Sequence, residues 1–125
     1  MLKILKCNHC GNTVKTVKDS GVPVVCCGEP MKVLEPNTTD AALEKHVPVV
    51  TVEGNKAYVA VGSVEHPMVP EHYITSIFLE TDQAVHEKAL SADDKPEAVF
   101  ALNEDEKVIA AYEYCNLHGF WKKEL

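Results

Sequence analysis

Five cysteines and four histidines form two groups that have the composition of metal-ligand sets. The first group is Cys7, Cys10, Cys26 and Cys27, in the segments CNHC and CC. Two cysteines spaced by two residues can turn both sulfurs to one ion, and a second pair completes a tetrahedral four-thiolate site. Because the second pair is adjacent, its side chains diverge and the S–metal–S angles would be distorted. The pattern therefore predicts a metal that tolerates distortion, either iron in an electron-transfer site or zinc in a structural site.

Two other interpretations of the N-terminal cysteines are less favoured. A thioredoxin-type redox role for CNHC would need a surrounding βαβ pattern, which the sequence does not contain. Disulfide pairing is disfavoured because five thiols cannot all pair within one chain. His9 lies inside the CNHC knuckle, and we expect it to be exposed and not a ligand because four sulfurs already suffice.

The second group contains one cysteine and four histidines from distant parts of the sequence. His46 opens an expected strand, His66 and His72 bracket the loop HPMVPEH, and Cys115 and His118 lie in CNLHG. The turn before Gly119 would let both of its ligands face one ion and bring backbone N–H groups near the sulfur, which stabilises a thiolate. His86, within an expected strand, is interpreted as an ordinary surface or core residue.

Three interpretations of this second group remain. Cys115 could be a buried apolar cysteine at a strand end. A copper site of the cupredoxin type would need a methionine shortly after the second histidine, and GFWKKEL contains none. Four neutral imidazoles and one thiolate suit an iron with its sixth position open, since a thiolate donates electron density to the metal.

The elements expected to position these residues are mostly β-strands. Short apolar runs punctuated by turn signals predict an antiparallel, immunoglobulin-like β-sandwich. Residues 1–36 have too little apolar sequence for a core and are expected to need a metal. Residues 35–45 are interpreted as a linker with one helical turn, and residues 37–125 as the sandwich. The expected strands are residues 47–54, 56–62, 73–80, 83–90, 97–102 and 108–115.

Composition excludes several classes of function. The 125-residue chain has a net charge of −7 and its 12 basic residues are all lysines, so nucleic-acid binding is not expected. No stretch is long and apolar enough for a signal peptide or a membrane span. We therefore expect a cytoplasmic protein, in a compartment where grouped cysteines more often bind metal than form disulfides.

The motifs together resemble those of the desulfoferrodoxin family over essentially the whole chain. The resemblance is carried by CNHC…CC, EKHVPVV, HPMVPEHYI and CNLHGFWK. It implies a desulforedoxin-like module in residues 1–36 and a neelaredoxin-type sandwich in residues 37–125. It also implies two iron ions per chain. Cys7, Cys10, Cys26 and Cys27 would hold the first; His46, His66, His72 and His118, with Cys115 as axial ligand, would hold the second.

The resemblance implies a superoxide reductase, which reduces superoxide to hydrogen peroxide without producing dioxygen. Lys45 would attract superoxide and support protonation, and Glu44 could occupy the sixth position of the oxidised iron. The family is typically a homodimer that receives electrons from rubredoxin or a similar carrier. The alternatives are a non-catalytic electron-transfer or zinc-structured protein, a cupredoxin-like copper protein, and a dismutase, which must also oxidise superoxide.

Overall fold

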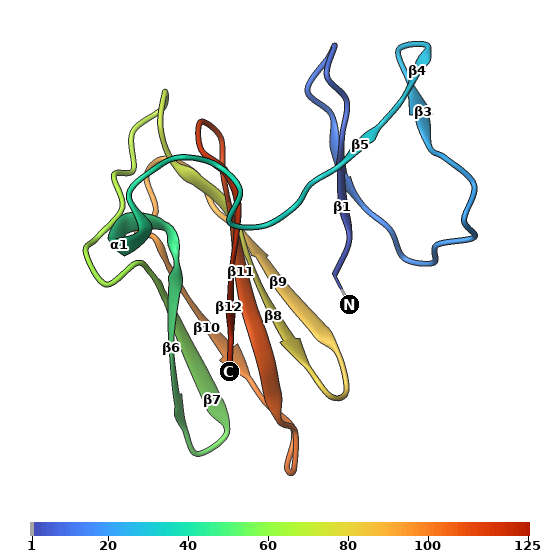
Figure 1. Cartoon of the computed structure of the whole chain (residues 1–125). Coiled ribbons are helices and arrows are strands. Elements are labelled where there is room, and N and C mark those ends of the chain that lie inside the picture. The colour runs from blue at the N-terminus through green and yellow to red at the C-terminus, as the bar shows by residue number, and fades with distance from the viewer. Residues whose placement is uncertain (1) are drawn as a thin grey trace. The chain divides into compact units, whose positions relative to one another are not determined.

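The structure is a computed structural model that describes residues 2–125, and its chain forms two compact units, Met1–Glu35 and Pro36–Leu125. The N-terminal unit contains only short strands (Figure 1). They form a three-stranded sheet of order β2-β1-β5 and a separate β3–β4 pair. Their bounds are β1 Ile4–Lys6, β2 Thr13–Lys15, β3 Val25–Cys26, β4 Glu29–Pro30 and β5 Lys32–Val33.

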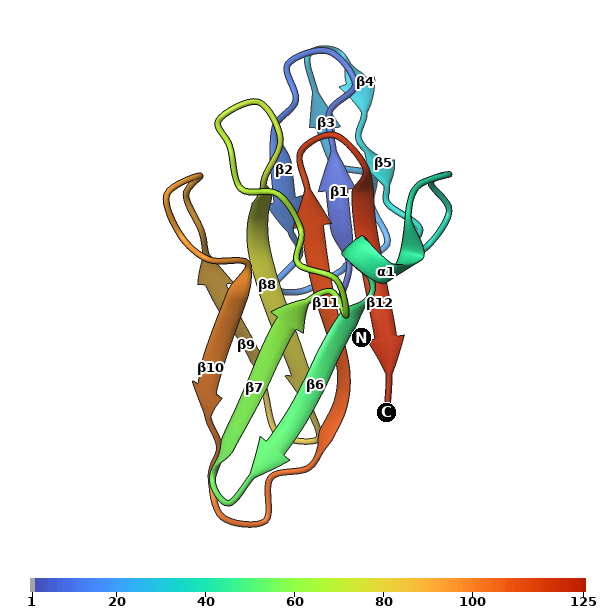
Figure 2. The same ribbon diagram turned by 90° about the vertical axis from the view of Figure 1, so that its left-hand side faces the viewer.

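The C-terminal unit consists of one helical turn and seven strands. They are α1 Leu43–His46, β6 Pro48–Glu53, β7 Lys56–Val61, β8 Ile74–Thr81, β9 Val85–Ala89, β10 Glu97–Ala101, β11 Val108–Cys115 and β12 Gly119–Glu124. All pairings are antiparallel and form two sheets, of order β10-β7-β6 and β12-β11-β8-β9. Figure 2 shows the three-stranded sheet in front of the other. The expected all-β sandwich fold is therefore confirmed.

Alternating side chains of the two sheets form the core of this unit. In β7, Val59 and Val61 are buried, whereas Tyr58, the residue before Val59 in the strand, is exposed. Ile77 and Leu79 of β8 belong to the same buried cluster. Each fully buried side chain of this kind contributes about 1.5–3 kcal/mol of transfer free energy. The sandwich thus has a hydrophobic core of its own.

Strand β12 was not among the strands expected from the sequence. It pairs with β11 from Cys115↔Gly119 to Ala110↔Glu124. Its sequence, GFWKKE, has only two adjacent apolar residues followed by lysines, so it lacks the alternation that indicates a strand. Pairing with β11 compensates for this weak pattern.

Three segments carry the second ligand group to one end of the sandwich. They are α1, residues 62–73 between β7 and β8, and the turn joining β11 to β12 (Figures 1 and 2). Gly62 lies under α1, where an added Cβ would come within 2.6 Å of the Glu44 carbonyl oxygen.

Among the described residues, no helix has the length and apolar character needed to cross a bilayer.

Candidate metal centres

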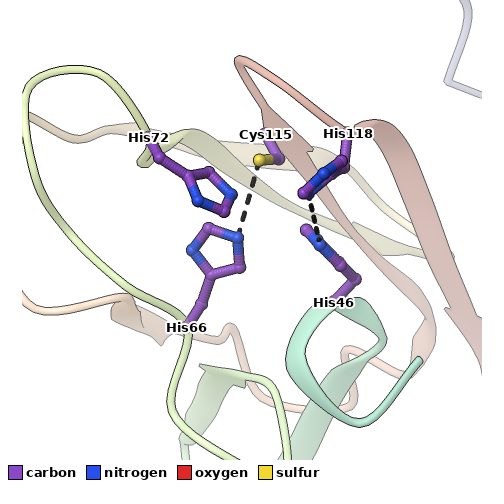
Figure 3. Close-up of side chains that lie close together, drawn as sticks. All are labelled: His46, His66, His72, Cys115 and His118. Carbon is purple, nitrogen blue, oxygen red and sulfur yellow. Dashed lines mark hydrogen bonds between the residues drawn. The ribbon is translucent and has the colours of Figure 1, made fainter. Parts of the chain in front are cut away.

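The structure brings together the five residues of the second group, His46, His66, His72, Cys115 and His118. Their ligand atoms all lie within 4.8 Å of one another. In Figure 3 the five side chains converge from α1, from the loop before β8, from the end of β11 and from the turn that follows it. Cys115 and His66 are completely or almost completely buried, and His72 and His118 are half-buried. We call this set the His4Cys cluster.

The distances identify the ring nitrogens that face the common point. His46 Nε2 lies 3.1 Å from His118 Nδ1, and Cys115 Sγ lies 3.5 Å from His66 Nε2. Two nitrogens bound to one ion at about 2.1 Å and at right angles would be about 3 Å apart. His72 Nε2 is buried and has no hydrogen-bond partner. A cation at this point would satisfy that nitrogen, so the cluster fits a transition-metal ion with nitrogen and sulfur ligands.

Burial keeps His46, His66 and His72 in the neutral form that binds metal. It lowers the pKa of His46 and of His66 to about 4, assisted by the charges of the neighbouring imidazoles. Burial also lowers the pKa of His72. The charge of Lys45 contributes to all three shifts. At neutral pH these three imidazoles therefore have lone pairs available for an ion.

Burial raises the pKa of the Cys115 thiol, and two backbone groups act in the opposite direction. The N–H groups of His118 and Leu117 donate hydrogen bonds to its sulfur. This arrangement agrees with the expectation for a turn closed by Gly119, whose φ is 80°. A bound cation would favour the thiolate further because it stabilises the negative charge.

Two residues that sequence reasoning missed hold His46 in place. Its Nδ1 lies 3.2 Å from Glu113 Oε2, and its ring stacks on Trp121 at a centroid distance of 4.8 Å. Burial raises the pKa of Glu113 to about 9. Trp121 Nε1 also donates to the His118 carbonyl at 3.0 Å. A signal for Glu113 was available, since it is the only acidic residue in the apolar run VIAAYEYC.

A pocket of 430 Å³ opens onto the histidines. Its lining is Ala41, Ala42, Lys45, His46, His66, Pro67, His72 and His118. His66 is fixed there by its Nδ1, which lies 2.7 Å from the Pro67 carbonyl oxygen and donates to it. Lys45 is exposed and lines the pocket. A small anion entering the pocket would thus meet imidazole faces and one cationic side chain.

Glu44 is placed differently from the other predicted site residues. It lines a neighbouring pocket with Leu43, Val47 and Ser63, and not the histidine pocket. Its carbonyl oxygen accepts hydrogen bonds from Val64 N–H at 2.9 Å and from Ser63 Oγ at 3.3 Å. A carboxylate ligand from Glu44 would therefore require α1 to move.

The four N-terminal cysteines also lie within 4.8 Å of one another. Cys10 Sγ is 3.6 Å from Cys26 Sγ, and Cys26 Sγ is 4.0 Å from Cys27 Sγ. Tetrahedral thiolates at about 2.3 Å from one ion would be about 3.8 Å apart, so the group fits a metal. Cys27 has a φ of 52°, followed by Gly28 at 77°. This left-handed backbone turns the adjacent cysteines toward a common point.

Backbone N–H groups prepare these sulfurs for negative charge. The N–H groups of Cys10 and His9 donate to Cys7 Sγ at 3.5 and 3.4 Å and lower the pKa of Cys7 to about 6.

The two remaining histidines have carboxylate partners. His9 is exposed, with Nε2 2.9 Å from Glu29 Oε2. His86 pairs with the buried Glu106 carboxylate at 2.7 Å. Neither histidine belongs to a ligand cluster within residues 2–125.

Comparisons with known proteins match both units. Residues 38–124 match the family model described as desulfoferrodoxin, and residues 1–34 match the model of the desulfoferrodoxin N-terminal domain. A desulfoferrodoxin homolog of Archaeoglobus fulgidus is 48% identical over 122 residues, covering 98% of this chain and 96% of that protein.

Two solved structures are similar as well. The crystal structure of the superoxide reductase from Treponema pallidum aligns with a TM-score of 0.84 and 41% identity, covering 99% of each chain. The one-iron superoxide reductase from Giardia intestinalis aligns with a TM-score of 0.56 and 34% identity. That alignment covers 66% of this chain and 99% of the other.

Proposed function

The chain belongs to the desulfoferrodoxin family, and we propose that it is a superoxide reductase whose chemistry takes place at the His4Cys cluster. The observation that carries this proposal is the convergence of four imidazoles and one buried sulfur beside a pocket with a lysine at its rim. The names of its relatives and structural neighbours support the same activity.

We propose iron at both clusters, held by His46, His66, His72, Cys115 and His118 in one and by Cys7, Cys10, Cys26 and Cys27 in the other. Iron held by the His4Cys cluster would supply the electron that reduces superoxide. The reaction consumes superoxide, one electron and two protons and gives hydrogen peroxide. Residues 1–36 would form the desulforedoxin-like module and residues 37–125 the catalytic sandwich.

The protein's own charges make the role of Lys45 specific. Residues 36–125 contain seven lysines and sixteen acidic residues, so the unit that carries the pocket repels anions at long range. A local positive charge is then needed to raise the concentration of superoxide at the site. Lys45 lines the pocket and its charge is felt by three of the four histidines. Its ammonium group can also hold a water that supplies protons.

The remaining parts of the proposal concern partners and location. We propose rubredoxin or a similar carrier as electron donor, a homodimer as the assembly, and the cytoplasm as the compartment. All five cysteines are free thiols, which suits a reducing compartment. Glu44 would approach the oxidised iron after a movement of α1.

The experiment is a product balance on the iron-loaded protein with an excess of reductant. Superoxide is generated by pulse radiolysis, and hydrogen peroxide and dioxygen are both measured. A reductase gives one peroxide for each superoxide consumed and releases no dioxygen. Equal yields of peroxide and dioxygen would show a dismutase, and no acceleration of superoxide decay would leave a non-catalytic metalloprotein.

A further inference from the structure

The side chain of Asn116 continues the contact between β8 and β11 beyond the end of their ladder. The last ladder pair is Cys115↔Ile74, after a register shift between Tyr114 and Cys115. Beyond it, the Asn116 N–H donates to the Tyr73 carbonyl at 3.2 Å. The Tyr73 N–H donates to Asn116 Oδ1 at 2.9 Å, and Asn116 Nδ2 donates to the Glu71 carbonyl at 3.2 Å. One amide thus holds the backbone on both sides of His72.

His72 depends on its backbone for orientation more than His46 and His66 do. The His46 ring is held by Glu113, and the His66 ring is held by the Pro67 carbonyl. Such a second hydrogen bond normally fixes the orientation of a metal-binding imidazole. Within residues 2–125 the His72 ring has no equivalent bond, and its buried Nε2 is unpartnered. The direction of that nitrogen is therefore set by residues 71–73.

We propose that Asn116 is a positioning residue of the His4Cys cluster, which keeps His72 aimed at the point shared by Cys115 and His118. Asn116 lies between these two ligands in sequence, so its amide couples the ligand turn after β11 to the ligand loop before β8. The inference rests on the proposed metal centre. It assigns a function to a residue that touches neither the metal nor the substrate.

The contacts require both ends of the amide. Oδ1 accepts from Tyr73 and Nδ2 donates to Glu71, so alanine loses both bonds. In Asn116→Asp the acceptor remains, but the donor is replaced by a carboxylate oxygen that faces the Glu71 carbonyl. Asn116→Ala therefore removes both side-chain bonds, whereas Asn116→Asp removes only the bond to Glu71 and nearly keeps the shape of the side chain.

Asp82 offers a matched control at the other end of the same two strands, beyond the Thr81↔Val108 pair. Its Oδ1 accepts from the Lys107 N–H at 2.9 Å, and its own N–H donates to the Lys107 carbonyl at 2.9 Å. The contacts are of the same kind, but neither sequence neighbour of Lys107 is in the His4Cys cluster. The control is therefore Asp82→Ala.

The test is the affinity of the full chain for Co²⁺, measured against a competing chelator. Binding is followed by quenching of Trp121, the only tryptophan, which stacks on His46 and so reports on the His4Cys cluster. We expect Asn116→Ala to bind Co²⁺ about 10–100-fold more weakly, in the range measured for residues that orient metal ligands. Asp82→Ala should bind within about twofold of the wild type because Asp82 holds no ligand segment.

A spectroscopic readout separates positioning from general destabilisation. The band from charge transfer between the Cys115 sulfur and Co²⁺ should shift in Asn116→Asp and stay fixed in Asp82→Ala. Wild-type affinity with an unshifted band in both Asn116 variants would overturn the inference. If Asn116→Ala does not fold by circular dichroism, Asn116→Asp decides. Failure of the wild type to quench with Co²⁺ would overturn the metal centre itself.

Discussion

The two ligand clusters are built on scaffolds of opposite kinds. In the N-terminal unit the buried apolar residues of the described part are Leu2, Ile4, Leu5 and Cys7, and its strands have two or three residues. In the C-terminal unit the strands reach eight residues and enclose a hydrophobic core. The first scaffold is too small to fold on apolar burial alone, whereas the second can fold before it binds metal.

The ligands are supported in correspondingly different ways. In the N-terminal unit, N–H groups of the same turns reach the sulfurs, as from His9 and Cys10 to Cys7. In the C-terminal unit, the ligands come from three distant segments and are held by residues such as Glu113 and Asn116. We therefore propose that the four-cysteine site assembles only when it binds metal, whereas the His4Cys site is formed by the fold itself.

Removal of metal should show the difference between the two units most clearly. In the metal-free, reduced protein, we expect backbone amides of β1 and β2 to lose protection from hydrogen exchange by about a thousandfold or more. The reason is that structural metal binding supplies about 10 kcal/mol of folding free energy in small domains. Amides of β8 and β11 should keep their protection. Equal loss of protection in both units would contradict the difference.

Replacement of Lys45 tests whether the reaction with superoxide takes place in the C-terminal unit. We expect Lys45→Ala to slow the bimolecular reaction with superoxide about tenfold at low salt and to flatten its dependence on ionic strength. The control is Lys32→Ala, which removes an exposed lysine from β5 of the other unit. A rate that falls equally in both variants would show a general charge effect and not a local one.

Proton release on metal binding should also differ between the clusters. Contact with the Cys10 sulfur is the main reason why the pKa of Cys26 is raised. The same contact is the main reason why the pKa of Cys27 is raised to about 12. Both are then thiols at pH 7, and metal must displace about two protons or more from this cluster. In the His4Cys cluster the low pKa values of His46, His66 and His72 keep these imidazoles neutral, so the main proton released is that of the Cys115 thiol.

The consequence is a difference in pH dependence. Between pH 8 and 6, metal affinity should fall more steeply for the four-cysteine cluster, because protons compete for more of its ligands. The His4Cys cluster should lose its metal steeply only as the pH approaches the histidine pKa values of about 4. Calorimetry of Zn²⁺ binding to Cys10→Ser and to Cys115→Ser, in buffers of different ionisation enthalpy, measures each release. Equal proton numbers would contradict the expectation.

Glu44→Ala should have the smallest effect on the encounter with superoxide. Its side chain lies outside the histidine pocket, so we expect the bimolecular rate to stay within about twofold of the wild type. If Glu44 approaches the oxidised iron, the ferric absorption spectrum and its change with pH should differ in the variant. An unaltered ferric spectrum from pH 5 to 9 would remove Glu44 from the mechanism.

The sequence was sufficient to identify the two ligand groups because their residue types and spacings have few other uses. Cys115 and His118, for instance, stand in one short turn whose glycine has the positive φ that such a turn needs. The sandwich was predictable from alternation in β7 and from the turn at Gly54, which joins Glu53 to Lys56. These features depend on neighbours in the chain.

The supporting residues depend on tertiary contacts and could not be predicted in the same way. The apolar run around Glu113 signals a buried carboxyl, but its partner His46 lies 67 residues away in the sequence and only the fold brings the two together. Asparagine is a common residue in turns, so Asn116 does not stand out in the sequence, and the partners of its side chain are more than 40 residues away. Likewise, β12 becomes a strand through its pairing with β11.

The central claim is that the His4Cys cluster alone carries the reaction with superoxide. It is tested most directly by the decay of superoxide on pulse radiolysis, compared between Cys10→Ser and Cys115→Ser, both reduced chemically. Cys10→Ser should react within about twofold of the wild-type rate, and Cys115→Ser should be slower by about 100-fold or more. A slow Cys10→Ser beside an active Cys115→Ser would contradict the account and move the chemistry to the four-cysteine cluster.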